Sequence, residues 1–171
     1  MARFFIVITI VLINFILQTT WPMQIFGISP NTAIIIVVSF AILRHEVEGA
    51  MIGFFAGLLQ DVFFGVIIGL NAFLYMLIGF FSGKPFKEFY VENYLLPIAL
   101  IGITTFLFNF AYYLLNFLFR ARLDIFSYVW SIILPSTLYN IAITLPIYVF
   151  IYRINSRLES HEKHSRKIFN R

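Results

Sequence analysis

The sequence contains no cysteine, and only 12% of its 171 residues are charged. The absence of cysteine excludes disulfides and thiolate sites of any kind. The shortage of charge is matched by an excess of apolar side chains, because 61% of the residues are hydrophobic, 19% are aromatic and the mean hydropathy is +0.91. This composition is typical of an integral membrane protein.

Signatures of catalysis are also missing. The sequence has no Gly-x-Ser-x-Gly elbow, no phosphate-binding glycine loop, no dinucleotide fingerprint and no His-Glu-x-x-His zinc helix. His161 and His164 have the spacing of metal ligands on a helix, but no cluster of acids supports them. We therefore expect no enzymatic activity, no catalytic residue, no cofactor and no metal site.

Apolar segments divide the chain into about six stretches that could each cross a membrane. They are roughly residues 4–17, 30–43, two stretches within 47–81, 95–119 and 128–152. Each crossing needs about 20 residues, so six crossings leave no room for a soluble catalytic domain. The sequence predicts an all-α integral membrane protein, a compact bundle of about six transmembrane helices over residues 1–153, followed by a basic cytoplasmic tail at 154–171.

A glycine series marks the third apolar segment, where Gly49, Gly53, Gly57 and Asp61 recur every four residues. That spacing places the four residues along one side of a helix, and glycines on such a side let another helix come close. Together with Gly65 they are predicted to form a helix-packing surface or an interface with a partner.

Asp61 is the only acidic residue between Glu48 and Glu88. An ionised carboxylate in hydrocarbon is costly unless water or a polar partner meets it. The turn between the third and fourth segments is expected near Gly65 to Asn71, which places Asp61 close to the membrane edge. We favour a carboxylate that reaches water or caps a neighbouring helix over an ion-coupling site.

The second apolar segment opens with Ser29, Pro30 and Asn31, which have the form of a helix start. A hydroxyl side chain can cap a helix, and proline is tolerated in the first turn because its missing N–H costs no hydrogen bond there. We expect a capping hydroxyl and a proline in the first turn of this helix.

Two stripes of polar side chains lie within the last two apolar segments. Their members are Asn109, Tyr112 and Asn116 in the fifth segment and Thr137, Asn140 and Thr144 in the sixth. Each set falls on one side of its helix. Hydrogen bonds between helices, worth about 1 kcal/mol each, are the favoured interpretation. The alternative is a cavity that receives a ligand or a partner's helix.

Lysine and arginine are unevenly distributed between the two sides of a six-helix bundle. With the N-terminus inside, ten lie on the inner side, namely Arg3, Arg44, Lys84, Lys87, Arg153, Arg157, Lys163, Arg166, Lys167 and Arg171, and two lie on the outer side, Arg120 and Arg122. The positive-inside rule then predicts that both termini are cytoplasmic. The tail is expected to contact anionic lipids or to dock a cytoplasmic partner, and no nucleic acid is expected as a partner.

Several motifs, in their order and spacing, resemble the rod shape-determining MreD family of bacteria. They are Ser29-Pro30-Asn31, Arg44-His-Glu-Val-Glu-Gly49, Gly53-Phe-Phe-Ala-Gly57-Leu-Leu-Gln-Asp61, Gly69-Leu-Asn71, and Tyr139-Asn140 followed by Pro146. The resemblance covers nearly the whole chain. It implies a non-enzymatic subunit of the bacterial inner membrane that helps to organise synthesis of the lateral cell wall.

The resemblance also implies partners: an MreC-like bitopic membrane protein, the actin-like MreB filament, the RodA polymerase and a class B penicillin-binding protein. It further implies the six-helix architecture of the substrate-binding subunits of energy-coupling-factor transporters. That kinship supplies the main alternative, a vitamin-binding transport subunit whose polar stripes would line a pocket. A third hypothesis, a proton-coupled carrier that uses Asp61, would need a paired ionisable group or an internal repeat. The sequence gives no indication of oligomeric state.

Overall fold

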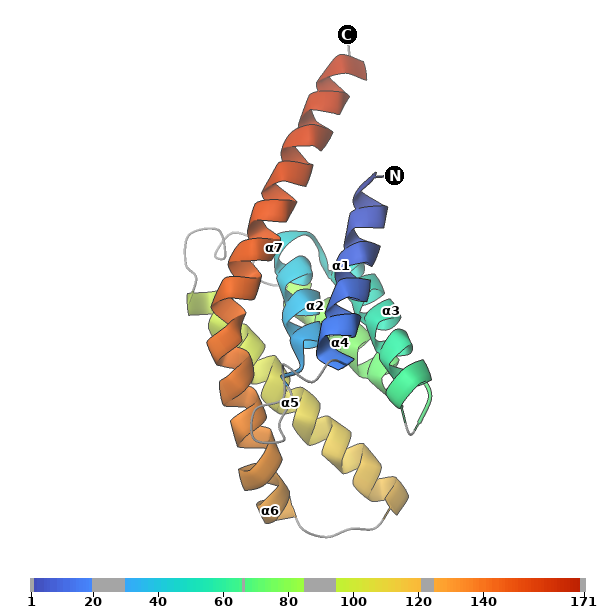
Figure 1. Ribbon diagram of the computed structural model, residues 1–171, viewed down its shortest axis with the longest axis vertical. Helices are drawn as coiled ribbons and strands as arrows, with labels where there is room; N and C mark the ends of the chain where they lie inside the picture. Colours follow the sequence, from blue (N-terminus) through green and yellow to red (C-terminus); the bar gives the residue numbers. More distant parts are fainter. Residues whose placement is uncertain (1, 20–29, 66, 85–94, 121–124, 170–171) are drawn as a thin grey trace.

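The computed structural model describes residues 2–19, 30–65, 67–84, 95–120 and 125–169, and the regular structure of these residues is helical. The elements in chain order are α1 (Ala2–Thr19), α2 (Thr32–Leu43), α3 (Glu46–Phe64), α4 (Leu70–Gly83), α5 (Leu95–Arg120), α6 (Ile125–Tyr128), the π-helical turn η2 (Val129–Ile133) and α7 (Leu134–Phe169). Figure 1 shows a helical bundle from which the end of α7 projects. The predicted all-helical fold is confirmed in this part of the chain.

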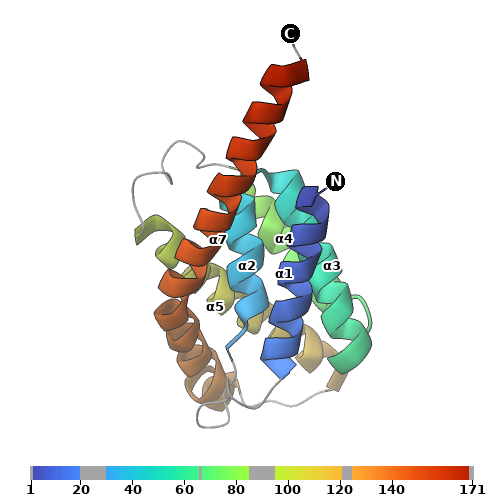
Figure 2. The ribbon, with the colours of Figure 1, turned by 45° about the horizontal axis from the view of Figure 1, so that its top comes forward.

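The short helix α2 forms the centre of the bundle. Of its 12 residues, 11 are buried, and its apolar residues are distributed around the whole helix. A helix that is hydrophobic on all sides has no face to turn toward water, so it is enclosed by other helices. Accordingly, α2 contacts α1, α3, α4, α5 and α7, and Figure 2 shows it between α7 and the neighbouring α1 and α3.

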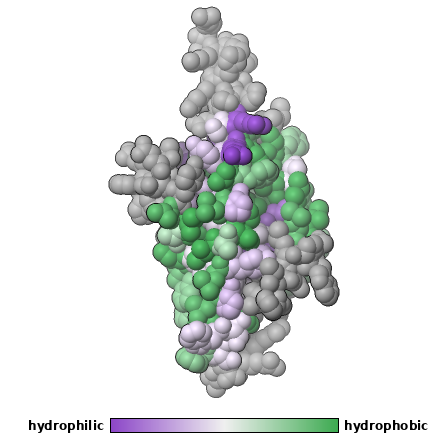
Figure 3. All heavy atoms as spheres, turned by 60° about the vertical axis from the view of Figure 1, so that its left-hand side comes forward, coloured by the Kyte–Doolittle hydropathy of each residue, from purple (hydrophilic) through white to green (hydrophobic). Residues whose placement is uncertain are grey.

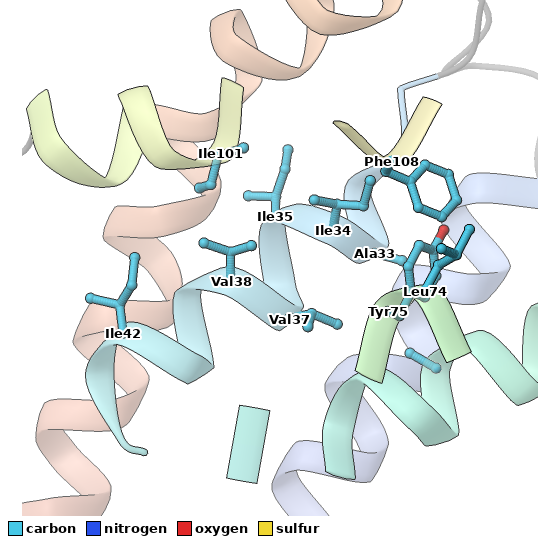
Figure 4. Packing of buried hydrophobic residues seen from close by; sticks show 11 residues of the cluster. Ala33, Ile34, Ile35, Val37, Val38, Ile42, Leu74, Tyr75, Ile101 and Phe108 are labelled. Atoms are coloured by element: carbon cyan, nitrogen blue, oxygen red, sulfur yellow. The ribbon is translucent and has the colours of Figure 1, made fainter. Parts of the chain in front are cut away.

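The main apolar core forms where α2 meets α4 and α5 (Figure 4). Ile34, Ile35 and Val38 of α2 belong to the same buried cluster as Tyr75 of α4 and Ile101 of α5, and all five are 0% exposed. Close packing of such side chains fixes the separation and rotation of the helices. This core positions the polar site described below, because Tyr75 belongs to both.

Six apolar helices are present where the sequence predicts them, but their lengths differ. Three helical stretches, Glu46–Phe64, Pro97–Leu115 and Phe126–Leu158, are long and apolar enough to cross a membrane, whereas those in α1, α2 and α4 are shorter. With 12 residues, α2 is about 18 Å long, against about 30 Å for the hydrocarbon layer. Because α2 is surrounded by protein, the thickness of the lipid does not set its length.

The predicted sixth segment is a continuous helical stretch formed by α6, η2 and α7. A π-helical turn lies near its start, where the N–H of Leu134 donates to the carbonyl of Val129, five residues earlier. From there α7 continues past residue 153 to Phe169. The predicted boundary between bundle and tail therefore does not coincide with a helix end, and Figure 1 shows α7 extending beyond the other helices.

Candidate functional site

The glycine series of α3 packs against α4 of the same chain. A Cβ added at Gly57 would lie 2.5 Å from backbone atoms of Asn71 and Ala72. A Cβ added at Gly53 would overlap the carbonyl group of Tyr75. The backbones of the two helices are therefore in direct contact along this face, which is filled by α4 and not by a partner protein.

Two glycines of α4, which the sequence analysis missed, complete this contact. A Cβ added at Gly83 would lie 2.5 Å from the Cα of Glu46, and one added at Gly79 would overlap the carbonyl group of Gly49. Gly79 and Gly83 are four residues apart, which is the spacing that revealed the series in α3. The same signal could therefore have predicted both sides of the α3–α4 contact.

Gly65 has a different role from the other glycines of the predicted surface. It is the C-cap of α3, and its N–H donates to the carbonyl of Asp61 at 2.9 Å. The atoms nearest to an added Cβ at Gly65 also belong to Asp61. Gly65 thus lies against the last turn of its own helix, outside the surface where α3 meets α4.

Asp61 caps the N-terminus of α4, although it belongs to α3. Its carboxylate accepts hydrogen bonds from the backbone N–H groups of Gly69 at 3.0 Å, Asn71 at 3.1 Å and Ala72 at 3.0 Å. The first N–H groups of a helix lack partners within the helix and carry partial positive charge, so a carboxylate at this place is stabilised. Asp61 is only 1% exposed, so it meets these N–H groups rather than open water.

The turn between α3 and α4 has the shape that this cap requires. Gly69, the N-cap residue of α4, has a φ of 97°, in the left-handed region where residues with side chains are strained. The turn reverses the chain so that the first N–H groups of α4 face the last turn of α3. Its predicted position near Gly65 to Asn71 is confirmed, because α3 ends at Phe64 and α4 begins at Leu70.

Beside the cap, the hydroxyl of Tyr75 connects α4 to α3 and to the start of α2. The hydroxyl oxygen lies 2.8 Å from Oδ1 of Asn31 and 2.5 Å from Oε1 of Gln60. Because the hydroxyl has one proton, it donates to one amide and accepts from the NH₂ group of the other. The ring of Tyr75 packs on Phe108 of α5, with 4.9 Å between ring centroids. The sequence analysis did not predict this cluster of four helices around Tyr75.

The start of α2 differs from the prediction. The helix begins at Thr32 with Asn31 as its N-cap, and the Asn31 side chain forms no capping hydrogen bond because Tyr75 engages it instead. Pro30 precedes the N-cap, so its predicted place in the first turn is wrong. Ser29, the predicted capping hydroxyl, lies outside the described residues.

A row of polar side chains follows the buried face of α7. Its members, which we call the polar seam, are Ser136, Asn140, Thr144, Tyr148 and Asn155, and each is at most 5% exposed. Nδ2 of Asn140 donates to Oγ1 of Thr105 in α5 at 3.1 Å and to the carbonyl of Asn31 at 3.4 Å. Asn140 thereby joins α7 to α5 and to the N-cap of α2.

Arg44 joins the opposite end of α2 to the polar seam. This residue is the C-cap of α2, and its Nε donates to Oδ1 of Asn155 in α7. Both ends of the central helix are therefore connected to α7 by hydrogen bonds, one through Asn140 and the other through Asn155. The sequence analysis treated Arg44 only as a charge in a loop.

Of the polar stripe predicted in the fifth segment, Asn109 contacts the polar seam. Nδ2 of Asn109 lies 3.4 Å from Oγ of Ser136, while Tyr112 stacks on Phe108 with 5.8 Å between ring centroids. The side chain of Asn116 lies outside the described part of the chain. The fifth segment thus contributes one amide and one aromatic ring, and Thr105 is a partner that the sequence analysis missed.

Thr137, which shares a side of α7 with Asn140 and Thr144, is less deeply buried than these two residues. Thr137 is half-buried, and its hydroxyl donates to the carbonyl of Ile133 in the preceding turn at 2.7 Å. Ser136 occupies the buried position four residues before Asn140 instead. The rotation of α7 against α5 decides between these neighbouring positions, and the polar pattern alone cannot.

The chemical groups that meet here are amides, hydroxyls and a carboxylate. Among the described residues, no three side chains of His, Cys, Asp or Glu are close enough to hold a metal ion. The Asp61 carboxylate accepts hydrogen bonds from three backbone N–H groups, and the Tyr75 hydroxyl bonds to two amides. This arrangement holds helices in fixed positions.

A protein-family model described as rod shape-determining protein MreD matches residues 1–156. The chain belongs to the MreD family. No curated protein and no solved structure matches it. The MreD match extends from α1 to Asn155 and beyond, so it contains the capped α3–α4 hairpin and the whole polar seam.

Membership of the MreD family gives the protein a role in determining the rod shape of cells, within the shape-determining complex. Its apolar helices identify it as an integral membrane protein. Two pairs of the motifs on which the resemblance was based meet in space, because Asp61 bonds to Gly69 and Asn71 at the α3–α4 turn and Asn140 bonds to Asn31 at the start of α2. Residues of these MreD motifs thus hold helices of the bundle together by hydrogen bonds.

Proposed function

We propose that this MreD family member is a non-enzymatic scaffold subunit of the bacterial cell elongation machinery. It holds an MreC-like bitopic protein in the membrane and connects it to the MreB filament, the RodA polymerase and a class B penicillin-binding protein. The family match over residues 1–156 is the observation that carries the proposal. Contact of the basic tail with anionic lipids belongs to the same proposal.

The geometry of the buried polar groups supports a structural role. Asp61, Tyr75 and Asn140 each bond to two or more groups on other segments of the chain. Buried networks of this kind hold a unique packing of helices. A bundle with a fixed interior presents a fixed outer surface, which is what a scaffold offers to its partners.

The partners of a scaffold with short connections must bind largely to its helices. The connection between α2 and α3 runs from Leu43 to Glu46, and the one between α3 and α4 from Phe64 to Leu70. A standard protein interface covers about 800 Å² on each partner, which is more than such turns expose. We therefore place the main contact with the MreC-like protein within the membrane.

As part of the proposal, both termini face the cytoplasm. The physical reason is the distribution of ten basic residues on one side and two on the other, because positive charge is retained on the cytoplasmic side. A reporter that is active only outside the cytoplasmic membrane should be silent when fused after Arg171. The same reporter should be active when inserted between Arg120 and Asp124. Activity of the Arg171 fusion would disprove the six-crossing arrangement.

Depletion of this protein from its rod-shaped host is expected to make the cells wide and round. Synthesis of the lateral wall loses its organisation in the absence of the scaffold, whereas synthesis at the division site continues. Microscopy of cell width and length during depletion measures the effect, and expression of the intact chain from a second copy of the gene is the control. The purified protein should co-purify with the MreC-like protein and should not turn over the lipid-linked wall precursor.

The same depletion separates the scaffold from a vitamin transport subunit. We propose that the bundle shares the six-helix architecture of the substrate-binding subunits of energy-coupling-factor transporters, and its six apolar helices support this kinship. Shared architecture does not determine function, because one fold can hold different sites. If the depleted cells remain rod-shaped but need an external vitamin to grow, the scaffold function is wrong and the transport function is favoured.

A further inference from the structure

Charged residues mark one end of the α3–α4 hairpin. Glu46 and Glu48 lie in the first turn of α3, and Lys84 is the C-cap of α4. The two helix ends are adjacent, because a Cβ added at Gly83 would lie 2.5 Å from the Cα of Glu46. The Lys84 ammonium lies 4.2 Å from the centre of the Phe80 ring, one turn back along α4. Since an ammonium is costly in hydrocarbon, the hydrocarbon layer begins at about this turn.

The same level of the membrane can be located on α7. Arg44, which precedes α3, bonds to Asn155, and the neighbouring Arg153 and Arg157 are exposed. Figure 3, which brings the α7 side of the molecule forward, shows strongly hydrophilic atoms gathered near the projecting end of α7, beside a largely apolar surface. The polar boundary of the membrane therefore runs from the start of α3 to residues 153–157 of α7.

Measured from this boundary, the hairpin is shorter than a bilayer is thick. With 14 residues, α4 is about 21 Å long, and with 19 residues α3 is about 28 Å long. Although α3 by itself is long enough to cross a membrane, its first turn belongs to the charged boundary, which leaves about 24 Å of apolar helix. The hydrocarbon layer is about 30 Å thick, and any tilt reduces the height of the hairpin further.

At its other end the hairpin exposes apolar side chains up to the turn. Val62, Phe63 and Phe64 at the end of α3 are exposed, and so is Ile68 in the turn. No residue from 62 to 70 has a polar side chain. An exposed run of this kind marks contact with an apolar partner. Contact with the acyl chains of lipids therefore continues to the end of the hairpin.

The backbone of the turn belongs at the level of the lipid headgroups. Irregular backbone is not found against hydrocarbon unless protein encloses it. Gly65, Ile67 and Gly69 are only half-buried, so protein does not enclose the turn. A bilayer meets a short apolar surface by becoming thinner around it. The hydrocarbon beside the hairpin is then only as thick as the distance from the charged end to the turn.

The opposite side of the bundle is taller. Phe126 of α6, Trp130 of η2 and Phe150 of α7 are exposed, so apolar residues face lipid along most of this helical stretch. Phe126 and Phe150 are about 36 Å apart along the helix, which matches an ordinary bilayer when the helix is tilted. In Figure 1, α5 and α6 also reach lower than the α3–α4 turn. The two sides of the bundle therefore fit bilayers of different thickness.

We propose that the lipid-facing side of the α3–α4 hairpin, with Phe55, Phe73 and Phe81, thins the bilayer and selects lipids with short acyl chains. These three side chains are exposed between the charged end and the turn, so they contact the selected chains. Hydrophobic matching is the physical cause, because a long-chain lipid must compress its chains to fit this height. The inference concerns the membrane around the protein and does not depend on the scaffold function.

Tryptophan fluorescence in vesicles tests this selection. The chain has two tryptophans, Trp21 and Trp130. The Trp21→Phe variant keeps Trp130 as its reporter, on the side of α6 and α7. A second variant combines Trp21→Phe and Trp130→Phe with Phe73→Trp, which places the reporter on the exposed face of α4. Each purified protein is reconstituted into mixtures of dioleoyl phosphatidylcholine and the shorter dimyristoleoyl phosphatidylcholine, and each lipid in turn is brominated to quench fluorescence.

The shorter lipid should be enriched next to the hairpin reporter. Quenching of Phe73→Trp should show the shorter lipid at about twice its share of the mixture or more, because its chains match the hairpin. Quenching of Trp130 should show no enrichment of the shorter lipid. Phe55→Trp, on the exposed face of α3, reports on the same surface and should show the same enrichment, including where Phe73→Trp accumulates poorly.

Other outcomes would overturn the inference. Equal proportions of the two lipids at Phe73→Trp and Phe55→Trp would show that the hairpin does not select chain length. Equal enrichment of the shorter lipid at Trp130 would show that the two sides of the bundle do not differ. Absence of quenching at both hairpin reporters would show that a second copy covers this side. The vesicles contain no partner protein, so none of these results bears on the scaffold function.

Discussion

Gly57→Ala is expected to lower the midpoint of thermal unfolding by roughly 6 to 12 °C. The added Cβ would lie 2.5 Å from backbone atoms of Asn71 and Ala72, which cannot rotate out of its way as a side chain could. Overpacking of an interior costs about 1 to 3 kcal/mol, and contact with backbone places this substitution at the upper end. Circular dichroism of the purified protein in mild detergent measures the midpoint.

Gly102→Ala is the matched control for Gly57→Ala. A Cβ at Gly102 would meet only a side chain at its nearest contacts, Cδ1 of Ile141 at 3.0 Å, and that side chain can change its rotamer. Both substitutions gain the same helix propensity, so the difference between them reports packing. We expect Gly102→Ala to change the midpoint by less than about 2 °C. Equal destabilisation by both substitutions would contradict the close α3–α4 contact.

Asp61→Leu is expected to destabilise the protein by about 3 kcal/mol or more, because it leaves the N–H groups of Gly69, Asn71 and Ala72 at the start of α4 without an acceptor. Asp61→Asn should have an intermediate effect. One amide oxygen can replace Oδ2, which accepts from Gly69 and Ala72, while the NH₂ group would face the N–H of Asn71. The abundance in membranes and the midpoint of thermal unfolding should therefore both be highest for the wild type, lower for Asp61→Asn and lowest for Asp61→Leu.

Val62→Leu is the control for Asp61→Leu, since Val62 is the next residue of α3 and is exposed. It adds an apolar side chain at the surface, where no cap is disturbed, and should leave both measurements unchanged. The ion-coupling hypothesis predicts a different pattern. If Asp61→Asn were abundant and stable but as inactive as Asp61→Leu in maintaining cell shape, Asp61 would have a role beyond capping.

Much of the helical layout followed from the apolar segments and the length that a membrane crossing needs, and the exceptions have physical causes. The break between α3 and α4 was predicted because two apolar stretches had to be divided near Gly65 to Asn71. The length of α2 was not predicted, because a helix enclosed by protein need not match the thickness of the lipid. The start of α2 was misplaced because Asn31 bonds to Tyr75, a contact across 44 residues of sequence that overrides local capping.

The sequence alone determined that the chain lies in a membrane, since 61% hydrophobic residues cannot be buried in a single water-exposed domain of 171 residues. It also determined that the glycine side of α3 needs a close neighbour. Only the tertiary structure decided that this neighbour is α4, that Asp61 accepts from three N–H groups at the start of α4 and that Ser136 bonds to Asn109 of α5. Periodicity fixes which residues share one side of a helix. The rotation of that side toward its partners is set by the packing of all the helices together.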